Sequence, residues 1–115
     1  MKKLSLVLLP IFLMTIVVFS GCAKDDSIIS GNVSCVISGT EYIADGATVY
    51  LMINETEYAQ KTTTDADGYY QFYPVIDGTY HIEAEITVNS TYYFDKSDQF
   101  YTEKDDIYTV DLVLR

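Results

Sequence analysis

Hydrophobic and polar residues alternate with a period of two through most of the chain after residue 27. Such alternation is typical of β-strands that bury one face in a core and expose the other. The pattern is clearest over 69–88, where two turn sequences rich in Asp and Gly, at 65–68 and 74–78, accompany it. Because Asp-Gly between alternating runs favours a hairpin, we expect the strands on either side of Asp77-Gly78 to pair.

The alternation predicts seven strands, which together favour a β-sandwich. No segment after residue 27 has helical periodicity. The Thr-rich strand is expected at a sheet edge, where its lysine would discourage stray pairing. The inward side chains of the central strands include Tyr70 and Phe72. The short segments 42–44 and 100–101 are left open between strand and loop. The predicted strands span 28–37, 48–53, 58–64, 69–73, 79–88, 92–94 and 107–114.

The centre of the chain carries a family motif: Thr-Asp-x-x-Gly-x-Tyr-x-Phe over 64–72, a Val, then Gly-Thr-Tyr-x-Ile-x-Ala over 78–84. This order resembles the central motif of carboxypeptidase regulatory-like domains, although that family usually has Phe where Tyr70 stands. The resemblance implies an all-β, seven-stranded Greek-key β-sandwich of the transthyretin-like (prealbumin-like) type over 28–115. It also implies a structural or accessory role without catalysis.

The first 21 residues have the layout of a secretory signal, with Lys2 and Lys3 ahead of an apolar run from Leu4 to Phe19. The ending Phe-Ser-Gly-Cys at 19–22 resembles a bacterial lipobox, which implies cleavage before Cys22 and lipidation of its thiol. We therefore expect a signal helix over 1–21, and a lipidated cysteine with an acidic tether over 22–27. The alternative is an uncleaved anchor, since the run is near the lower length limit for a span, about 17 residues.

Charge and cysteine content limit the partners and the location. Acidic residues outnumber basic ones 17 to 7, so phosphate backbones would repel the chain and we expect no nucleic-acid partner. Cys35 is in phase with apolar neighbours and is predicted to be a small buried residue. The lipobox implies the bacterial cell envelope. Lys-Asp-Asp at 24–26 resembles an acidic export tag, which implies the outer membrane, and the alternative is an ordinary polar tether between lipid and domain. The expected partners are the membrane, through the lipid, and an envelope protein or a glycan.

Candidate chemical groups are few. His81, Glu83 and Glu85 share the predicted outward face of one strand, with about 6.6 Å along the strand between each residue and the next. A histidine with carboxylates suits zinc, but any solvent-facing strand has this pattern, so we expect no metal site. His81 is the only histidine and has no nucleophile beside it, so we expect no catalytic residue, no cofactor and no enzymatic activity. The acidic turn at 65–68 lacks the end ligands of an EF-hand, and a surface calcium site there is left open.

Surplus tyrosines are the strongest sign of a binding face, since the chain has 11 Tyr and no Trp. Tyr69 and Tyr73 should face outward, and Tyr50 and Tyr92 are candidates to lie near them. Exposed tyrosines can stack on sugar rings, whereas the alternative is cross-strand aromatic pairing that stabilises a sheet. The leading hypothesis is a lipid-anchored, non-catalytic accessory or interaction module. The alternative is a carbohydrate-binding surface lipoprotein that uses these four tyrosines.

Overall fold

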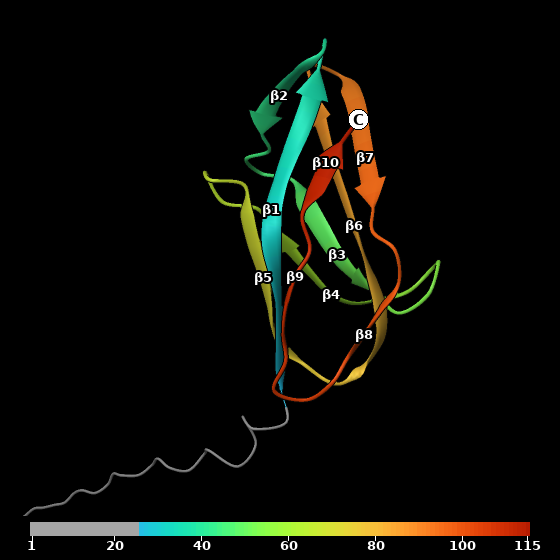
Figure 1. The fold of residues 1–115 in the computed structure, drawn as a ribbon. Helices are drawn as coiled ribbons and strands as arrows, with labels where there is room; N and C mark the ends of the chain where they lie inside the picture. The colour runs from blue at the N-terminus through green and yellow to red at the C-terminus, as the bar shows by residue number, and fades with distance from the viewer. Residues whose placement is uncertain (1–25) are drawn as a thin grey trace, which may run out of the picture.

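The computed structural model describes residues 26–115, which form ten strands in two five-stranded sheets packed face to face (Figure 1). The predicted all-β sandwich is confirmed, while the expected helix over 1–21 lies outside the described residues. Among residues 26–115, no helix is long and apolar enough to cross a membrane. The first sheet contains β1 (Ser27–Ile37), β2 (Thr40–Ile43), β5 (Tyr69–Val75), β9 (Ile107–Thr109) and β10 (Leu112–Leu114). The second contains β3 (Thr48–Met52), β4 (Tyr58–Thr63), β6 (Gly78–Val88), β7 (Thr91–Lys96) and β8 (Phe100–Thr102).

One long strand in each sheet receives most of the pairing. In the first sheet, the start of β1 pairs with β5 and β9, and its end pairs with β2 and β10. In the second, β6 lies between β3 and β7, and its first residues pair with β8. β4 is the edge strand beyond β3, which confirms the position predicted for the Thr-rich segment.

The hairpin predicted at Asp77-Gly78 is wrong. β5 pairs with β1 in the first sheet, whereas β6 pairs with β3, β7 and β8 in the second. Gly78 already belongs to β6 and is not among the glycines with positive φ, so the turn geometry that closes tight hairpins is not formed. The short connection at 76–77 therefore crosses from one sheet to the other.

The ten observed strands include the seven predicted ones. The two segments left open are strands β2 and β8, and the predicted last strand is divided into β9 and β10. The register of the β3–β4 pair shifts between Leu51 and Met52 through an extra residue on β4, whereas β3 stays regular against β6. Met52 is buried opposite the buried His81, and Ile53, which was expected among the inward residues, lies beyond the end of β3 and is exposed.

The core lies between the sheets, where the inward side chains of both meet. Tyr70 and Phe72 pack edge to face there, with ring centroids 5.6 Å apart. Cys35 is buried with a free thiol, as predicted, and burial raises the pKa of that thiol. The core cluster is Ile29, Val33, Cys35, Ala44, Ala47, Val49, Leu51, Tyr70, Phe72, Val75, Ile82, Ala84, Leu112 and Leu114.

The break between β9 and β10 is packed tightly against β1. A Cβ atom on Gly31 would lie 1.9 Å from the carbonyl oxygen of Val110, so only glycine permits this approach. The buried Tyr70 hydroxyl donates to the same carbonyl at 2.6 Å, and burial raises the pKa of this phenol. This contact ties β5 to the C-terminal strands.

The sandwich has two distinct ends (Figure 1). One end holds the start of β1, the β5–β6 connection and the β8–β9 connection. The opposite end holds the β1–β2 and β6–β7 turns. The chain therefore enters the domain at the first end, and β1 carries it to the other.

Candidate binding face

The outer face of the second sheet brings together side chains from four strands. In the pairing register, Glu85 of β6 lies opposite Thr48 of β3 and Phe94 of β7. Two residues after Glu85 in β6, and on the same face, Thr87 lies opposite Tyr92 of β7. Because alternate residues share a face, Tyr50 and Tyr92 flank Glu85 from the two neighbouring strands.

Glu85 is held between two phenols. Its Oε2 atom accepts a hydrogen bond from the Tyr50 hydroxyl at 2.8 Å, and its Oε1 atom accepts one from the Tyr92 hydroxyl at 2.7 Å. These bonds favour the neutral phenols, so the pKa of Tyr50 is raised and that of Tyr92 is raised to about 12. The carboxylate thus fixes two rings on one flat surface.

Two further aromatic rings extend this surface. Tyr58 lies edge to face with Tyr50 at 5.4 Å between centroids, and Phe94 stacks with Tyr92 at 6.4 Å. The Lys61 ammonium is 6.0 Å from the centroids of both Tyr50 and Tyr58, within cation–π range. We call the surface formed by Tyr50, Tyr58, Glu85, Tyr92 and Phe94 the aromatic face.

The aromatic face is open to solvent. Tyr58, Tyr92 and Phe94 are 50%, 57% and 37% exposed. A shallow polar pocket of about 260 Å³ lies beside Tyr92 and Glu85, lined also by Gly46, Thr48, Ile86 and Thr87. Aromatic surface with an adjoining polar hollow is a form suited to a ligand that has both apolar and hydroxyl groups.

The structure brings only two of the four predicted tyrosines together. Tyr50 and Tyr92 share Glu85, whereas Tyr69 and Tyr73 project from β5 in the first sheet. Both β5 tyrosines face outward as expected, at 39% and 48% exposure. They lie on the opposite side of the sandwich from the aromatic face.

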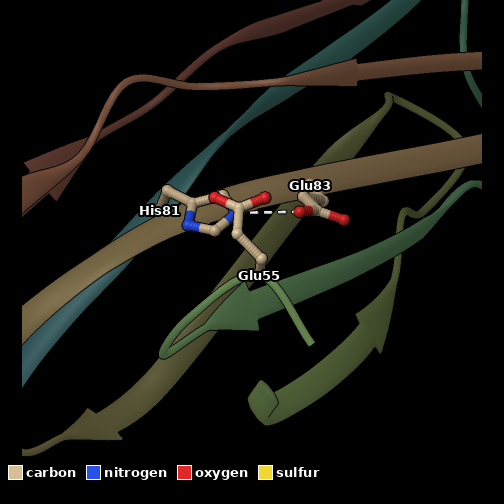
Figure 2. A group of neighbouring side chains, drawn as sticks. All are labelled: Glu55, His81 and Glu83. Carbon is tan, nitrogen blue, oxygen red and sulfur yellow. Dashed lines mark hydrogen bonds and ion pairs between the residues drawn. The ribbon is translucent and has the colours of Figure 1, made fainter. Parts of the chain in front are cut away.

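His81 departs from the prediction of a solvent-facing side chain, since it is only 3% exposed. The loop between β3 and β4 covers it, and Figure 2 shows Glu55 reaching over the imidazole from that loop. The His81 Nε2 atom donates to Glu83 at 2.8 Å, and Glu55 forms an ion pair with Lys96 at 3.4 Å. His81 therefore lies on the predicted face of β6, but the solvent exposure expected there fails because the loop folds over it.

Glu55, His81 and Glu83 are the described residues with a geometry that could hold a cation, because their ligand atoms all lie within 4.8 Å of one another. One imidazole and two carboxylates form a donor set that zinc accepts. Here, however, the imidazole is already bonded to Glu83, and Lys96 balances the charge of Glu55. The observed contacts account for all three side chains.

The acidic turn at 65–68 uses its first carboxylate to hold the backbone. Asp65 Oδ1 accepts the backbone N–H groups of Asp67 and Tyr69 at 2.9 and 3.0 Å, and Gly68 has φ +76°. These are the bonds of a turn closed by an Asp side chain and a glycine. The turn prediction is confirmed.

Comparison with known proteins places this fold in a family. The sequence model for the second β-sandwich domain of BOS complex subunit NOMO1-like proteins matches residues 28–114. The chain belongs to this family. As a NOMO1-like second-domain sandwich, it shares the transthyretin-like or immunoglobulin-like architecture that the carboxypeptidase regulatory-like motif led us to expect. No curated protein sequence matches the chain.

A solved structure has the same fold. It is the crystal structure of a protein from Pseudomonas aeruginosa that is described as a proposed carbohydrate-binding protein. The two share 15% sequence identity with a TM-score of 0.59, over 79% of this chain and 90% of the other. At this identity the likeness concerns the fold.

Sequence reasoning missed part of the aromatic face. Phe94 is two residues from Tyr92, so the period of two was a sufficient signal for placing it on the same face. Tyr58 gave no such signal, because its place beside Tyr50 depends on the register shift between β3 and β4. Glu85 was predicted to face outward, but its two phenol partners come from strands distant in sequence.

Proposed function

We propose that this chain is a lipid-anchored, extracytoplasmic binding module without catalytic activity, and that its aromatic face binds carbohydrate. The observation that carries the proposal is the double hydrogen bond of Glu85 to Tyr50 and Tyr92. It holds two rings in place before any ligand arrives. Binding to such a surface costs little side-chain ordering, which otherwise opposes association.

The chemistry of the aromatic face matches that of a sugar. A pyranose ring has apolar C–H faces and a rim of hydroxyl groups. Tyrosine offers a flat apolar ring with a polar tip, at a low cost in conformational entropy. The half-exposed rings of Tyr58 and Tyr92 can cover C–H faces, while the polar pocket beside Glu85 can receive hydroxyls.

The comparisons support a binding role in general terms. The similar Pseudomonas structure is described as a proposed carbohydrate-binding protein, and the family takes its name from a subunit of a complex. The resemblance to carboxypeptidase regulatory-like domains supports an accessory role. The lone histidine also supports it, since it is buried and bonded to Glu83.

A glycan array tests the ligand class. The full chain in detergent is expected to bind a limited set of envelope glycans, and a Tyr50→Ala, Tyr92→Ala double variant is expected to lose them. The matched control is Tyr42→Ala, Tyr101→Ala, because both of these residues are 53% exposed and belong to other strands. Absence of binding by the parent, or equal loss in the control, would overturn the carbohydrate proposal.

The lipid anchor is a separate part of the proposal. It rests on the lipobox-like residues 19–22 and places the protein in the bacterial cell envelope, with the outer membrane favoured by the Lys-Asp-Asp run. Labelled palmitate should enter the parent and not a Cys22→Ser variant. Equal labelling of the two proteins would exclude Cys22 as the lipidated residue.

A further inference from the structure

An apolar row crosses the outer face of the first sheet at the end where the chain enters. Ile28 of β1 lies opposite Ile107 of β9, and Tyr73 of β5 projects on the same outer face next to the Phe72–Ile29 pair. Ile76 follows at the tip of the β5–β6 connection. Ile107 and Ile76 are 75% and 72% exposed, the highest values among the large apolar side chains described.

The row is confined to this end of the sheet. The next outward positions along the same three strands are Ser30, Gln71 and Thr109, which pair across the sheet and are polar. Farther along, Asn32 lies opposite Tyr69. Single exposed apolar residues are normal on a protein surface, whereas neighbouring ones rimmed by polar residues are typical of a contact site, and this row has such a polar rim.

The tether places this end close to its attachment point. Only four residues lie between Cys22 and Ser27, so the five steps of a fully extended tether span at most about 18 Å. Ser27 is fully buried, its hydroxyl donates to the Glu103 carbonyl at 2.5 Å, and it lies opposite Val75. The chain is therefore fixed to the domain at the first residue of β1, beside the apolar row.

We propose that the apolar row, Ile28, Tyr73, Ile76 and Ile107, docks on the interfacial region of the bilayer that holds the lipid. This inference rests on the proposed lipidation of Cys22. Isoleucine side chains enter the acyl boundary, while a tyrosine ring sits at the level of the headgroups with its hydroxyl toward water. Docking turns the first sheet toward the bilayer and leaves the aromatic face of the second sheet open to a glycan.

The charge around the row selects the type of bilayer. The two connections at this end carry exposed Asp77, Glu103 and Asp105 against one exposed cation, Lys104, so their balance is acidic. Anionic headgroups repel such a surface. The row therefore fits a zwitterionic bilayer, and docking should weaken as anionic lipid is added.

A tryptophan reporter tests the docking directly, because the chain contains no tryptophan. The lipidated full chain with Ile107→Trp is placed in phosphatidylcholine vesicles with brominated acyl chains, whose bromine quenches indole fluorescence on contact. Most of the emission should be lost relative to unbrominated vesicles. Tyr69→Trp, on the same outer face four residues before Tyr73 in β5, is the matched control and should keep its emission.

Further arms separate the explanations. Ile76→Ser in the Ile107→Trp chain should reduce the quenching, as should anionic lipid. An Ile107→Trp chain that floats with the vesicles but keeps its indole emission overturns the docking and leaves the anchor intact. A chain that does not float overturns both. Equal quenching at positions 69 and 107 would show that the tryptophan itself drives insertion, and it would also overturn the docking. A blue-shifted emission at position 107 that brominated lipid does not quench would indicate that a second copy of the chain covers the row, which overturns the docking as well.

Discussion

Both outer faces of the sandwich carry tyrosines, but different surroundings hold them. On the second sheet, Tyr50 and Tyr92 bond to one carboxylate and stack with further rings. On the first sheet, Tyr69 bonds to Gln71 within its own strand, and Tyr73 belongs to an apolar row. The number of tyrosines therefore does not identify a binding surface. The strand register, which places the Glu85 carboxylate between Tyr50 and Tyr92, distinguishes the two faces.

The difference also concerns direction. The apolar row is at the end of the first sheet where β1 begins, and the aromatic face is on the opposite side of the sandwich. A protein held by its N-terminus to a bilayer can use the first surface for the lipid and the second for a ligand. The following experiments test this division of roles.

The largest effect is expected in the core that both faces share. Phe72 is 1% exposed and packs against Tyr70, so Phe72→Ala should lower the free energy of unfolding by about 3–5 kcal/mol. Denaturant unfolding measures this loss, and Gln71→Ala, at the exposed neighbouring position, is the control. Coincident unfolding curves for Phe72→Ala and the parent would show that the two faces do not rest on this core.

The next effect concerns binding. Tyr92→Ala should weaken binding of an array-selected oligosaccharide by up to about tenfold, because it removes one stacking ring and one bond to Glu85. Tyr69→Ala, which removes an exposed tyrosine from the first sheet, should leave the affinity unchanged. Calorimetric titration of the two full-length variants with the oligosaccharide measures both affinities. A larger loss in Tyr69→Ala would assign the ligand to the first sheet.

A smaller effect concerns protonation. The Glu85 hydrogen bond is the main cause of the Tyr92 pKa of about 12, so Glu85→Gln should lower it toward the ordinary value of about 10. Since the folded-state pKa is raised, this bond contributes fully below about pH 10 and is lost as the pH rises toward 12. Carbon NMR of the tyrosine rings follows each phenol separately. An unchanged Tyr92 titration in Glu85→Gln would show that the carboxylate does not hold this ring.

The smallest effect is expected on the first sheet. Tyr69→Phe removes a hydroxyl that bonds only to the exposed Gln71 side chain at 3.0 Å. The free energy of unfolding should change by no more than about 0.5 kcal/mol, as is usual for surface substitutions. A loss above 1 kcal/mol, roughly twice that limit, would mean that the Tyr69 hydroxyl stabilises the fold through more than its bond to Gln71.

The sequence predicted most of the strands, because the period of two is local information. It placed Phe72 and Cys35 in the core correctly. It failed at Asp77-Gly78, where the same residues serve a tight hairpin or a crossing between sheets, and only long-range pairing decides between them. It also failed at His81, because the loop that covers this residue belongs to a different hairpin.

The candidate face was only half predictable for the same reason. Outward tyrosines follow from alternation within each strand, and all four candidates are at least partly exposed. Their grouping depends on which strands are neighbours in the sheets, and the residues within one strand do not determine this. Tyr50 and Glu85 are 35 residues apart in sequence, yet their side chains share a hydrogen bond.

The most direct measurement is a footprint of both faces in one experiment. The detergent-purified full chain is labelled with a carbene reagent in the presence and absence of the array-selected oligosaccharide, and modified residues are located by mass spectrometry. We expect protection at Tyr50, Tyr58 and Tyr92 with unchanged labelling at Tyr69 and Tyr73. Protection confined to the two β5 tyrosines would contradict the assignment of ligand binding to the second sheet.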